Sequence, residues 1–330
     1  MKYGRNGTVA RTATSCERDH AAMDATASRD AASPRISVVV CVKEDPRVGR
    51  LLEALARQTL DAAAFQVIVV SAGRERYDDA CSASPLQVTY AHSPVARHPT
   101  QRNIGLRLVS TELFVSTDAD CVPTERWLDD YVTAFDARPS ECVGVGGRIR
   151  KLAESTLTQR HGITIDDGQR SLNYLPAMPL PYITGANAAY RTAAVRAVGG
   201  YDERFACGDD VDISYRLQIR GGSLSVIDTA AIEHEDRATL WAHFHRFRFY
   251  AVDQALLFKL YRGGVNKRAC LCSYPWRRVS HSARTAKQAI RRPKTERREL
   301  LAEALVTLVE AAGTVVGNAQ GAIRHRVVYF

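Results

Sequence analysis

The sequence lacks several features that mark other classes of protein. None of its uninterrupted apolar runs approaches the ~20 residues that cross a bilayer. The longest candidate segment, residues 302–308, is interrupted by Glu303. The first 35 residues hold no apolar segment of the kind that a secretory signal needs. These absences argue against a dedicated bilayer-spanning protein and predict a cytoplasmic one. The 45% hydrophobic and 25% charged residues are typical of a globular fold.

The chain also lacks a disulfide framework. Its eight cysteines follow no regular spacing, at positions 16, 41, 81, 121, 142, 207, 270 and 272. Cys270 and Cys272 are two residues apart, but no second Cys/His pair at zinc-ligand spacing accompanies them. We therefore expect reduced thiols, with Cys41 and Cys142 buried as small hydrophobic side chains.

Excess positive charge is absent outside one segment. The chain carries 45 Lys and Arg against 36 Asp and Glu, a net charge of +9. Residues 261–300 hold 12 Lys and Arg against 2 Asp and Glu, a net charge of +10, so the other 290 residues carry −1. This distribution does not indicate a nucleic-acid-binding protein. We expect the basic and helical region 261–330 to contact an anionic membrane surface or a second copy of the chain.

The first part of the chain alternates between strand and helix patterns. Residues 36–42 form an apolar, β-branched run of the kind buried on both faces of a parallel sheet, and 48–56 have the apolar spacing of a helix. Further strands are predicted at 66–70, 86–90 and 112–117. These units predict an open, doubly wound α/β sheet, which binds ligands at the carboxyl ends of its strands.

The rest of the chain is less regular. Residues 1–35 show no periodicity and are expected to be a disordered leader, and 160–181 are expected to be an irregular loop. We predict two further strands and three further helices: strands at 143–149 and 223–227, and helices at 209–219, 239–261 and 299–316.

Two acids follow the predicted strand 112–117. Asp118 and Asp120 are two residues apart, which places both on one face of an extended chain. Two carboxylates so close repel each other unless a cation lies between them, and an all-oxygen site suits Mg²⁺ or Mn²⁺. By itself the pair is equally compatible with two solvated loop acids.

A second acidic cluster opens the predicted helix 209–219. Asp209, Asp210 and Asp212 lie in its first turn, where carboxylates interact favourably with the helix dipole. Helix capping accounts for one or two of these acids, but it does not account for the sequence around them.

Six short segments occur in the order and spacing of a known family. They are I-S-V-V-V-C-V at 36–42, Q-R-N-I-G at 101–105, T-D-A-D at 117–120, T-G-A-N-A-A-Y-R at 184–191, V-G-G-Y-D-E-R-F at 198–205 and G-D-D-V-D-I-S-Y-R-L at 208–217. Over about residues 36–260 the chain thereby resembles glycosyltransferase family 2, inverting nucleotide-sugar transferases of the GT-A fold. The resemblance implies a Rossmann-like, doubly wound mixed sheet. It divides the chain into a nucleotide-sugar half (36–140), an acceptor half (141–260) and a helical C-terminal extension (261–330).

The resemblance gives roles to the two acidic clusters. Asp118 and Asp120 look like the family's D-x-D motif, whose first acid holds the ribose side of the nucleotide and whose second binds a divalent metal, Mn²⁺ or Mg²⁺. Asp210 matches the general base of the family. Asp209 stands beside it where Glu is commoner, one methylene shorter.

Other residues are implied to surround the nucleotide-sugar. Lys43, Glu44 and Ser71 lie at the first two strand ends, where base and ribose are held in the family. Arg102 resembles the arginine that reaches the base, and His234 lies where members supply another metal contact.

One departure from the family pattern concerns the nucleotide base. The second strand ends in S-A-G-R at 71–74, where the family usually has Asp-Asp-Gly-Ser, so an acid that would contact the base is absent. UDP-sugars are the donors expected from the family, while GDP- and dTDP-sugars stay open.

The implied activity is metal-dependent, non-processive transfer of a hexosyl or N-acetylhexosaminyl group to a hydroxyl acceptor. The acceptor is a glycan, a lipid-linked sugar or a small natural product, and the candidates to line its site are Arg160, His161, His243, His245, Arg246 and Arg248. The helix N-terminus favours an ionised Asp210, whereas Asp209 and Asp212 oppose ionisation, so the sequence leaves the direction of its pKa open.

Other functions fit the sequence less well. A nucleotidyltransferase would show a glycine-rich loop after the first strand, but V-K-E-D-P at 42–46 has no glycine. A dehydrogenase would need G-x-G-x-x-G there, and a processive synthase would show Q-x-x-R-W and membrane spans. The alternative that we keep is a non-catalytic or nucleotidyltransferase-type nucleotide-sugar-binding protein with a basic membrane-contact tail.

Overall fold

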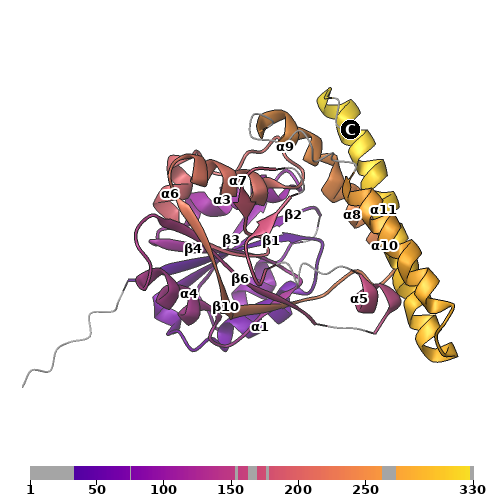
Figure 1. Cartoon of the computed structure of the whole chain (residues 1–330). Coiled ribbons are helices and arrows are strands. Elements are labelled where there is room, and N and C mark those ends of the chain that lie inside the picture. Colours follow the sequence, from indigo (N-terminus) through magenta and orange to yellow (C-terminus); the bar gives the residue numbers. More distant parts are fainter. Residues whose placement is uncertain are drawn as a thin grey trace, which may run out of the picture. The chain divides into compact units, whose positions relative to one another are not determined.

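The structure, a computed structural model, describes residues 33–74, 76–152, 155–162, 169–175, 178–261 and 273–327. The predicted leader lies almost wholly outside these residues. Within them one sheet has eight strands in the order β3-β2-β1-β4-β9-β6-β10-β5 (Figure 1). These strands are β1 (Ile36–Lys43), β2 (Phe65–Ala72), β3 (Val88–Ser93), β4 (Leu113–Asp118), β5 (Cys121–Pro123), β6 (Cys142–Lys151), β9 (Asn187–Arg191) and β10 (Ser223–His234).

The strand directions make the sheet mixed, as predicted. Strands β1 to β4 are mutually parallel, with Val40 of β1 opposite Val69 of β2 and Thr117 of β4. Strand β9 runs antiparallel between β4 and β6, and β10 is parallel to β6. The carboxyl ends of β1, β2 and β4 therefore share one edge of the sheet. Strand β5 follows β4 in the chain and pairs antiparallel with β10, so the end of β10 lies beside the segment that follows β4.

Helices cover both faces of the sheet, because the apolar run of β1 supplies side chains to each. Val38 and Val40 pack toward α1 (Val48–Ala56) and α4 (Trp127–Asp136), whereas Val39 packs toward the face that holds α3 (His98–Leu108) and α7 (Asp209–Ile219). The remaining short elements are η1 (Ala62–Ala64), α2 (Asp78–Ser82), α5 (Leu157–His161), α6 (Thr192–Ala197) and the two-stranded sheet β7 (Asn173–Tyr174) with β8 (Pro181–Tyr182).

The structure corrects three of the predicted elements. Strand β10 continues to His234, so this histidine ends the strand instead of following it. Part of the predicted loop 160–181 forms α5 and the β7–β8 pair. The predicted helix 239–261 is two helices, α8 (Leu240–Val252) and α9 (Gln254–Tyr261), which separate at Asp253. The buried carboxylate of Asp253 accepts hydrogen bonds from the backbone amides of Ala206 and Cys207, in the loop before α7. The chain turns at Asp253 to make these contacts.

The C-terminal region is a bundle in which α11 (Lys294–His325) packs against both α8 and α10 (Ser273–Ala289) (Figure 1). Among the described residues, α11 is long and apolar enough to cross a membrane by length and composition, and 44% of its most apolar window is buried inside the protein. The prediction from unbroken apolar runs was therefore too strict. It counted Glu303 as an interruption, but this carboxylate is paired with His281 within the bundle.

The cysteines agree with the prediction of reduced thiols as far as the structure describes them. Cys41, Cys81, Cys121, Cys142 and Cys207 are free, and the first four are buried. The other three lie outside the described residues.

Candidate functional site

Helix α3 carries the segment Q-R-N-I-G and connects the strand ends to the second half of the chain. The Gln101 amide donates to the carbonyl oxygens of Val42 and Val70, at 2.9 and 2.7 Å, and so bridges the ends of β1 and β2. Asn103 donates to the carbonyl oxygen of Tyr201 and accepts from the amide of the same residue, both at 2.8 Å. This segment therefore fixes the positions of two loops around the site.

Arg102 lies between the two acidic clusters. Its guanidinium donates to Asp209 Oδ2 at 2.5 Å and to Ser116 Oγ at 3.0 Å, and it lies 3.6 Å from Asp118 Oδ1. The side chains of Arg102 and Asp209 are each only 4% exposed, so the pair is held away from water. Because these contacts engage the guanidinium, the implied contact of Arg102 with a nucleotide base stays a prediction.

Asp210 follows Asp209 in the first turn of α7 but faces a different partner. Its Oδ2 accepts from the amide of Gly185 at 3.1 Å, and its Oδ1 accepts from the amide of Val211 at 2.9 Å. Burial, and then the negative charge of Asp209, raise the pKa of Asp210 to about 6, against the opposing effects of Arg102 and the two amides. The direction that the sequence left open is therefore upward.

The segment T-G-A-N at 184–187 owes its residue types to this arrangement. A Cβ on Gly185 would lie 2.7 Å from Arg102 Nη2, so only glycine lets its amide approach Asp210 beside the guanidinium. Asn187 binds inside the fold: its Oδ1 accepts from Trp127 Nε1 and from Tyr131 Oη, at 2.8 and 2.7 Å. Asn187 thus stabilises the fold by holding two side chains of α4, a role that its position in the family pattern did not indicate.

The D-x-D residues and His234 meet where β4 and β10 end and β5 begins. Asp118 is the last residue of β4, and the pairing of His234 with Cys121 brings the histidine beside Asp120. His234 Nε2 lies 3.6 Å from Asp120 Oδ2, and Arg47 Nη2 lies at the same distance from that oxygen. Asp118 Oδ1 is buried and accepts no hydrogen bond from the described residues.

These donors suit a divalent metal in part. Two ligands of one octahedral ion with bonds of about 2.1 Å are about 3 Å apart when adjacent and about 4.2 Å apart when opposite, so the spacing of Asp120 and His234 fits one ion. Oxygen and imidazole donors together are compatible with Mn²⁺. The described residues contain no group of three or more His, Cys, Asp or Glu side chains placed to hold a metal. Further ligands would therefore come from a substrate or from water.

Three predicted nucleotide contacts lie at neighbouring strand ends. Lys43 ends β1 with an exposed side chain, and Glu44, at φ 48°, accepts from the amide of Arg74 at 3.3 Å. Ser71 is fully buried, and its hydroxyl is hydrogen-bonded to Tyr90 Oη at 2.6 Å and to His92 Nδ1 at 3.1 Å. None of Lys43, Glu44 or Ser71 lines the cavity that contains Asp210, so their roles stay predictions.

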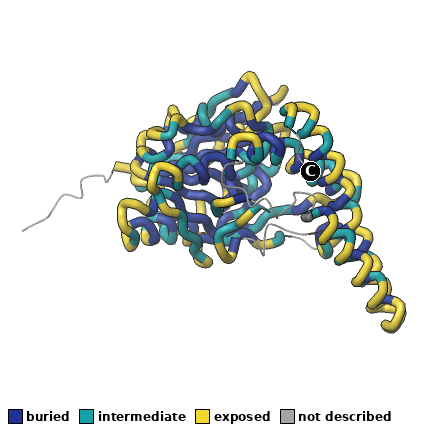
Figure 2. The backbone as a smooth tube through the Cα atoms, turned by 45° about the horizontal axis from the view of Figure 1, so that its top comes forward, coloured by how far each residue is buried: buried dark blue, intermediate teal, exposed yellow. Residues whose placement is uncertain are grey.

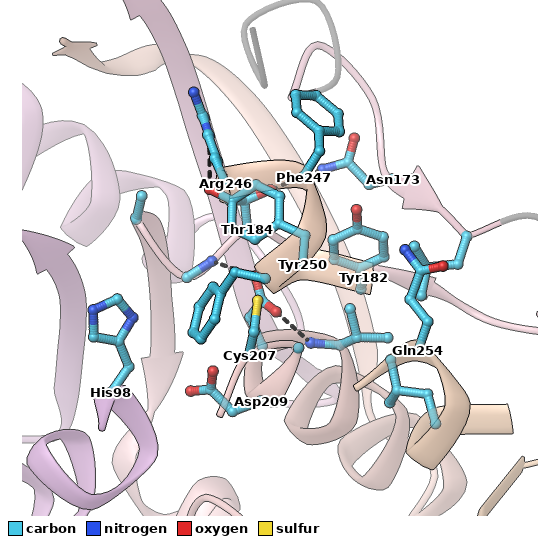
Figure 3. Close-up of a pocket in the computed structure, with 18 of the residues that line it drawn as sticks. His98, Asn173, Tyr182, Thr184, Cys207, Asp209, Arg246, Phe247, Tyr250 and Gln254 are labelled. Carbon is cyan, nitrogen blue, oxygen red and sulfur yellow. Dashed lines mark hydrogen bonds between the residues drawn. The ribbon is translucent and has the colours of Figure 1, made fainter. Parts of the chain in front are cut away.

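A cavity of about 570 Å³ opens beside the first turn of α7, and Figure 3 labels Asp209 of that turn among the residues that line it. Asp118, His234, Arg102, Asp209 and Asp210 line it. Its other walls include large apolar and aromatic side chains, which are Met178, Tyr182, Phe247, Phe249, Tyr250 and Leu257. The cavity therefore joins the two acidic clusters to an apolar surface supplied mainly by α8 and α9.

Of the six residues predicted to line the acceptor site, one lines the cavity and five do not. Arg246 of α8 lines the cavity and pairs with Asp236, which lies 3.7 Å from His234 Nδ1, so α8 is connected to the metal side of the site. Away from the cavity, His161 pairs with Glu299 and His243 with Glu310. The remaining candidates, Arg160, His245 and Arg248, do not line it either. Three aromatic residues of the same helix, Phe247, Phe249 and Tyr250, do line it. The alternation of aromatic and basic residues in F-H-R-F-R-F-Y at 244–250 was the sequence signal for them.

Comparison with known proteins identifies the family and the fold. The sequence model of the family described as "Glycosyltransferase like family 2" matches residues 34–248. The chain belongs to this family. Pre-mycofactocin glycosyltransferase from Mycobacterium tuberculosis (strain H37Rv) is 29% identical over 230 residues, covering 67% of this chain and 47% of the relative. Chondroitin synthase from Pasteurella multocida (strain Pm70) is 26% identical over 168 residues, covering 41% of this chain and 17% of the relative.

Solved structures of glycosyltransferases share the fold. Mannosyltransferase PcManGT from Pyrobaculum calidifontis, in complex with GDP-Man and Mn²⁺, aligns with a TM-score of 0.56 and 17% identity over 86% of this chain and 87% of that one. S. aureus TarS 1–349, in complex with UDP-GlcNAc, aligns with a TM-score of 0.50 and 14% identity over 90% and 93%. The predicted family and the GT-A-type fold are thus confirmed. The chain spans about half the length of the M. tuberculosis relative.

Proposed function

We propose that the protein is a metal-dependent, inverting and non-processive glycosyltransferase that moves a sugar from a nucleotide-sugar to a hydroxyl acceptor. The observation that carries the proposal is Asp210, whose carboxylate lines the cavity and has a pKa raised to about 6. A carboxylate with such a pKa is ionised at neutral pH and is a stronger base than an exposed aspartate.

The chemistry follows from the position of Asp210. The acceptor oxygen attacks the anomeric carbon while the bond from that carbon to the diphosphate oxygen breaks, and Asp210 takes the hydroxyl proton. A single displacement inverts the anomeric configuration. Arg102 pairs with Asp209, so that Asp210 is the carboxylate left to accept the proton.

The leaving diphosphate belongs at the other acidic cluster. Asp120 and His234 would hold a divalent ion there, which when bound neutralises charge on the leaving group. Asp118, whose buried Oδ1 accepts no hydrogen bond from the described residues, would face the donor from the end of β4. The aromatic surface of α8 then belongs to the acceptor side, and its flat apolar side chains suit a sugar ring or an apolar aglycone.

The base of the donor is the least constrained part of the proposal. UDP-sugars are the first donors to test, with GDP-sugars beside them, because the related folds hold GDP-Man in one protein and UDP-GlcNAc in another. Ser71 gives this chain no acid at the end of β2 to distinguish the bases.

Thermal unfolding with Mn²⁺ and each of UDP, GDP, dTDP and CDP tests the donor site. We expect at least one nucleotide to raise the unfolding temperature in the presence of Mn²⁺, and Asp210→Asn to retain this response. No response to any of the four nucleotides would contradict the proposal and favour a different ligand.

Two variants test the metal site in the same assay. Asp120→Ala and His234→Ala should each lose the part of the nucleotide response that depends on Mn²⁺, because each removes one of two protein donors. Asp228→Ala, which removes an exposed carboxylate on the same strand as His234, should keep it. An unchanged Mn²⁺ dependence in both site variants would place the metal elsewhere.

A further inference from the structure

One face of helix α11 is left uncovered by the described residues. Helix α8 covers a second side so closely that a Cβ on Gly317 would lie 2.2 Å from the carbonyl oxygen of Arg248. Helix α10 covers a third, where the Ser282 hydroxyl donates to the carbonyl oxygen of Ala304 at 2.7 Å. The remaining face exposes large apolar side chains, which are Leu301, Leu305, Leu308, Val315 and Ile323, with Ile323 80% exposed.

These side chains form one continuous stripe with a basic end. They recur every three or four residues, or at multiples of that spacing, so they lie on one side of the helix. The same spacing carried toward the N-terminus reaches the exposed residues Lys294, Arg297 and Arg298. We call these eight residues the outer face of α11. It is about 44 Å long at 1.5 Å per residue, and Figure 2 shows exposed and buried turns alternating along these helices.

The outer face carries charge of one sign only. The four acids of α11 lie on its other sides, and each pairs with an arginine or a histidine: Glu296 with Arg292, Glu299 with His161, Glu303 with His281, and Glu310 with Arg278. The neighbouring helix α10 has no acid at all between residues 273 and 289. Beside the basic end, the turn between α10 and α11 adds the exposed residues Ile290, Arg291 and Arg292.

We propose that the outer face of α11 docks on the surface of an anionic lipid bilayer, with the helix lying along the membrane plane. The leucine and valine side chains would enter the boundary of the acyl chains, while Lys294, Arg297 and Arg298 contact lipid phosphates. A second copy of the chain fits this pattern less well. Parallel packing would bring the two basic ends together, and antiparallel packing would lay each basic end on the apolar Ile323 end.

Vesicle co-sedimentation of the full chain tests the proposal, which does not depend on the catalytic assignment. The probes are vesicles of phosphatidylcholine with one quarter phosphatidylglycerol, and vesicles of phosphatidylcholine alone. We expect binding to the anionic vesicles only, with release in 1 M NaCl. The triple variants K294Q/R297Q/R298Q and L301Q/L305Q/L308Q should each weaken binding at least tenfold.

Matched variants elsewhere control for charge, polarity and folding. R57Q/R107Q/R220Q removes the same charge, and V95Q/L108Q/I219Q exchanges the same number of exposed apolar residues on the sheet domain. Both should bind as the parent protein does, and circular dichroism should show all four variants folded.

Four results would overturn the proposal. Equal binding to neutral and anionic vesicles would exclude the contact of the basic end with lipid phosphates. Equal binding by all variants would exclude the outer face from lipid contact. A change from dimer to monomer in light scattering, confined to the two outer-face variants, would assign the face to a second copy. Retention of the bound protein in high salt and alkaline carbonate would indicate a helix that crosses the bilayer.

Discussion

Replacing Asp210 by asparagine should stabilise the protein at neutral pH while removing the base. The pKa of Asp210 rises from its ordinary value of 3.8 to about 6 on folding, because the carboxyl is buried beside Asp209. A rise of this size corresponds to about 3 kcal/mol of destabilisation once the carboxyl is ionised. Asparagine carries no charge but can accept only one of the two amide hydrogen bonds, a loss of about 1 kcal/mol. The expected gain in unfolding free energy at pH 8 is therefore about 2 kcal/mol.

The sign of this effect should reverse in acid. Since the folded pKa lies above the unfolded one, the native state retains a proton through the window from about 4 to about 6, and its stability falls as pH rises through that window. Below pH 4 the parent carboxyl is already neutral, so the variant should lose its advantage and be slightly less stable.

Urea unfolding of both proteins across pH 3.5 to 8 measures the difference. Asp228→Asn, at an exposed carboxylate, should show no comparable trend. A difference between Asp210→Asn and the parent that does not change with pH, or a variant less stable at pH 8, would refute the account of Asp210 as a strained, buried base.

Two further predictions concern packing around the site. Arg102→Met should lower the unfolding free energy by about 3–5 kcal/mol, because it leaves Asp209 buried without its partner, and adding Asp209→Asn should recover part of this loss in urea unfolding. Gly105→Ala should cost about 1–3 kcal/mol, because a Cβ would lie 2.4 Å from Val39 Cγ1, whereas Gly49→Ala, with no atom within 4 Å, should stabilise by about 0.5–1 kcal/mol. Equal effects of the two glycine substitutions would contradict the close contact between α3 and β1.

The parts of the fold that the sequence predicted are those in which a local pattern decides the structure. The run that became β1 is almost entirely apolar and rich in β-branched valine, the pattern expected of a strand buried on both sides. The helix Asp209–Ile219 has an acidic first turn and a pair of glycines at its end, and its predicted bounds agree with the structure.

The parts that were missed depend on partners distant in the chain. The break between α8 and α9 at Asp253 arises because its carboxylate binds backbone amides more than forty residues away in the chain. The apolar periodicity of the helix carries no information about such a contact. His243 was a candidate for the acceptor site because of its residue type, yet its partner Glu310 lies in α11. Arg102 and Asp209 are also far apart in the sequence, so their pairing, on which the electrostatics of the site depend, could not be predicted from local patterns.

The anomeric configuration of the sugar first released from the donor tests the central claim most directly. With Mn²⁺ and a donor chosen by the thermal screen, water can replace the acceptor, and real-time proton NMR reports the anomer before it mutarotates. The account predicts an inverted sugar, formed at a rate that rises with pH through about 6 and is lost in Asp210→Asn. A retained configuration, or an undiminished rate in Asp210→Asn, would contradict it.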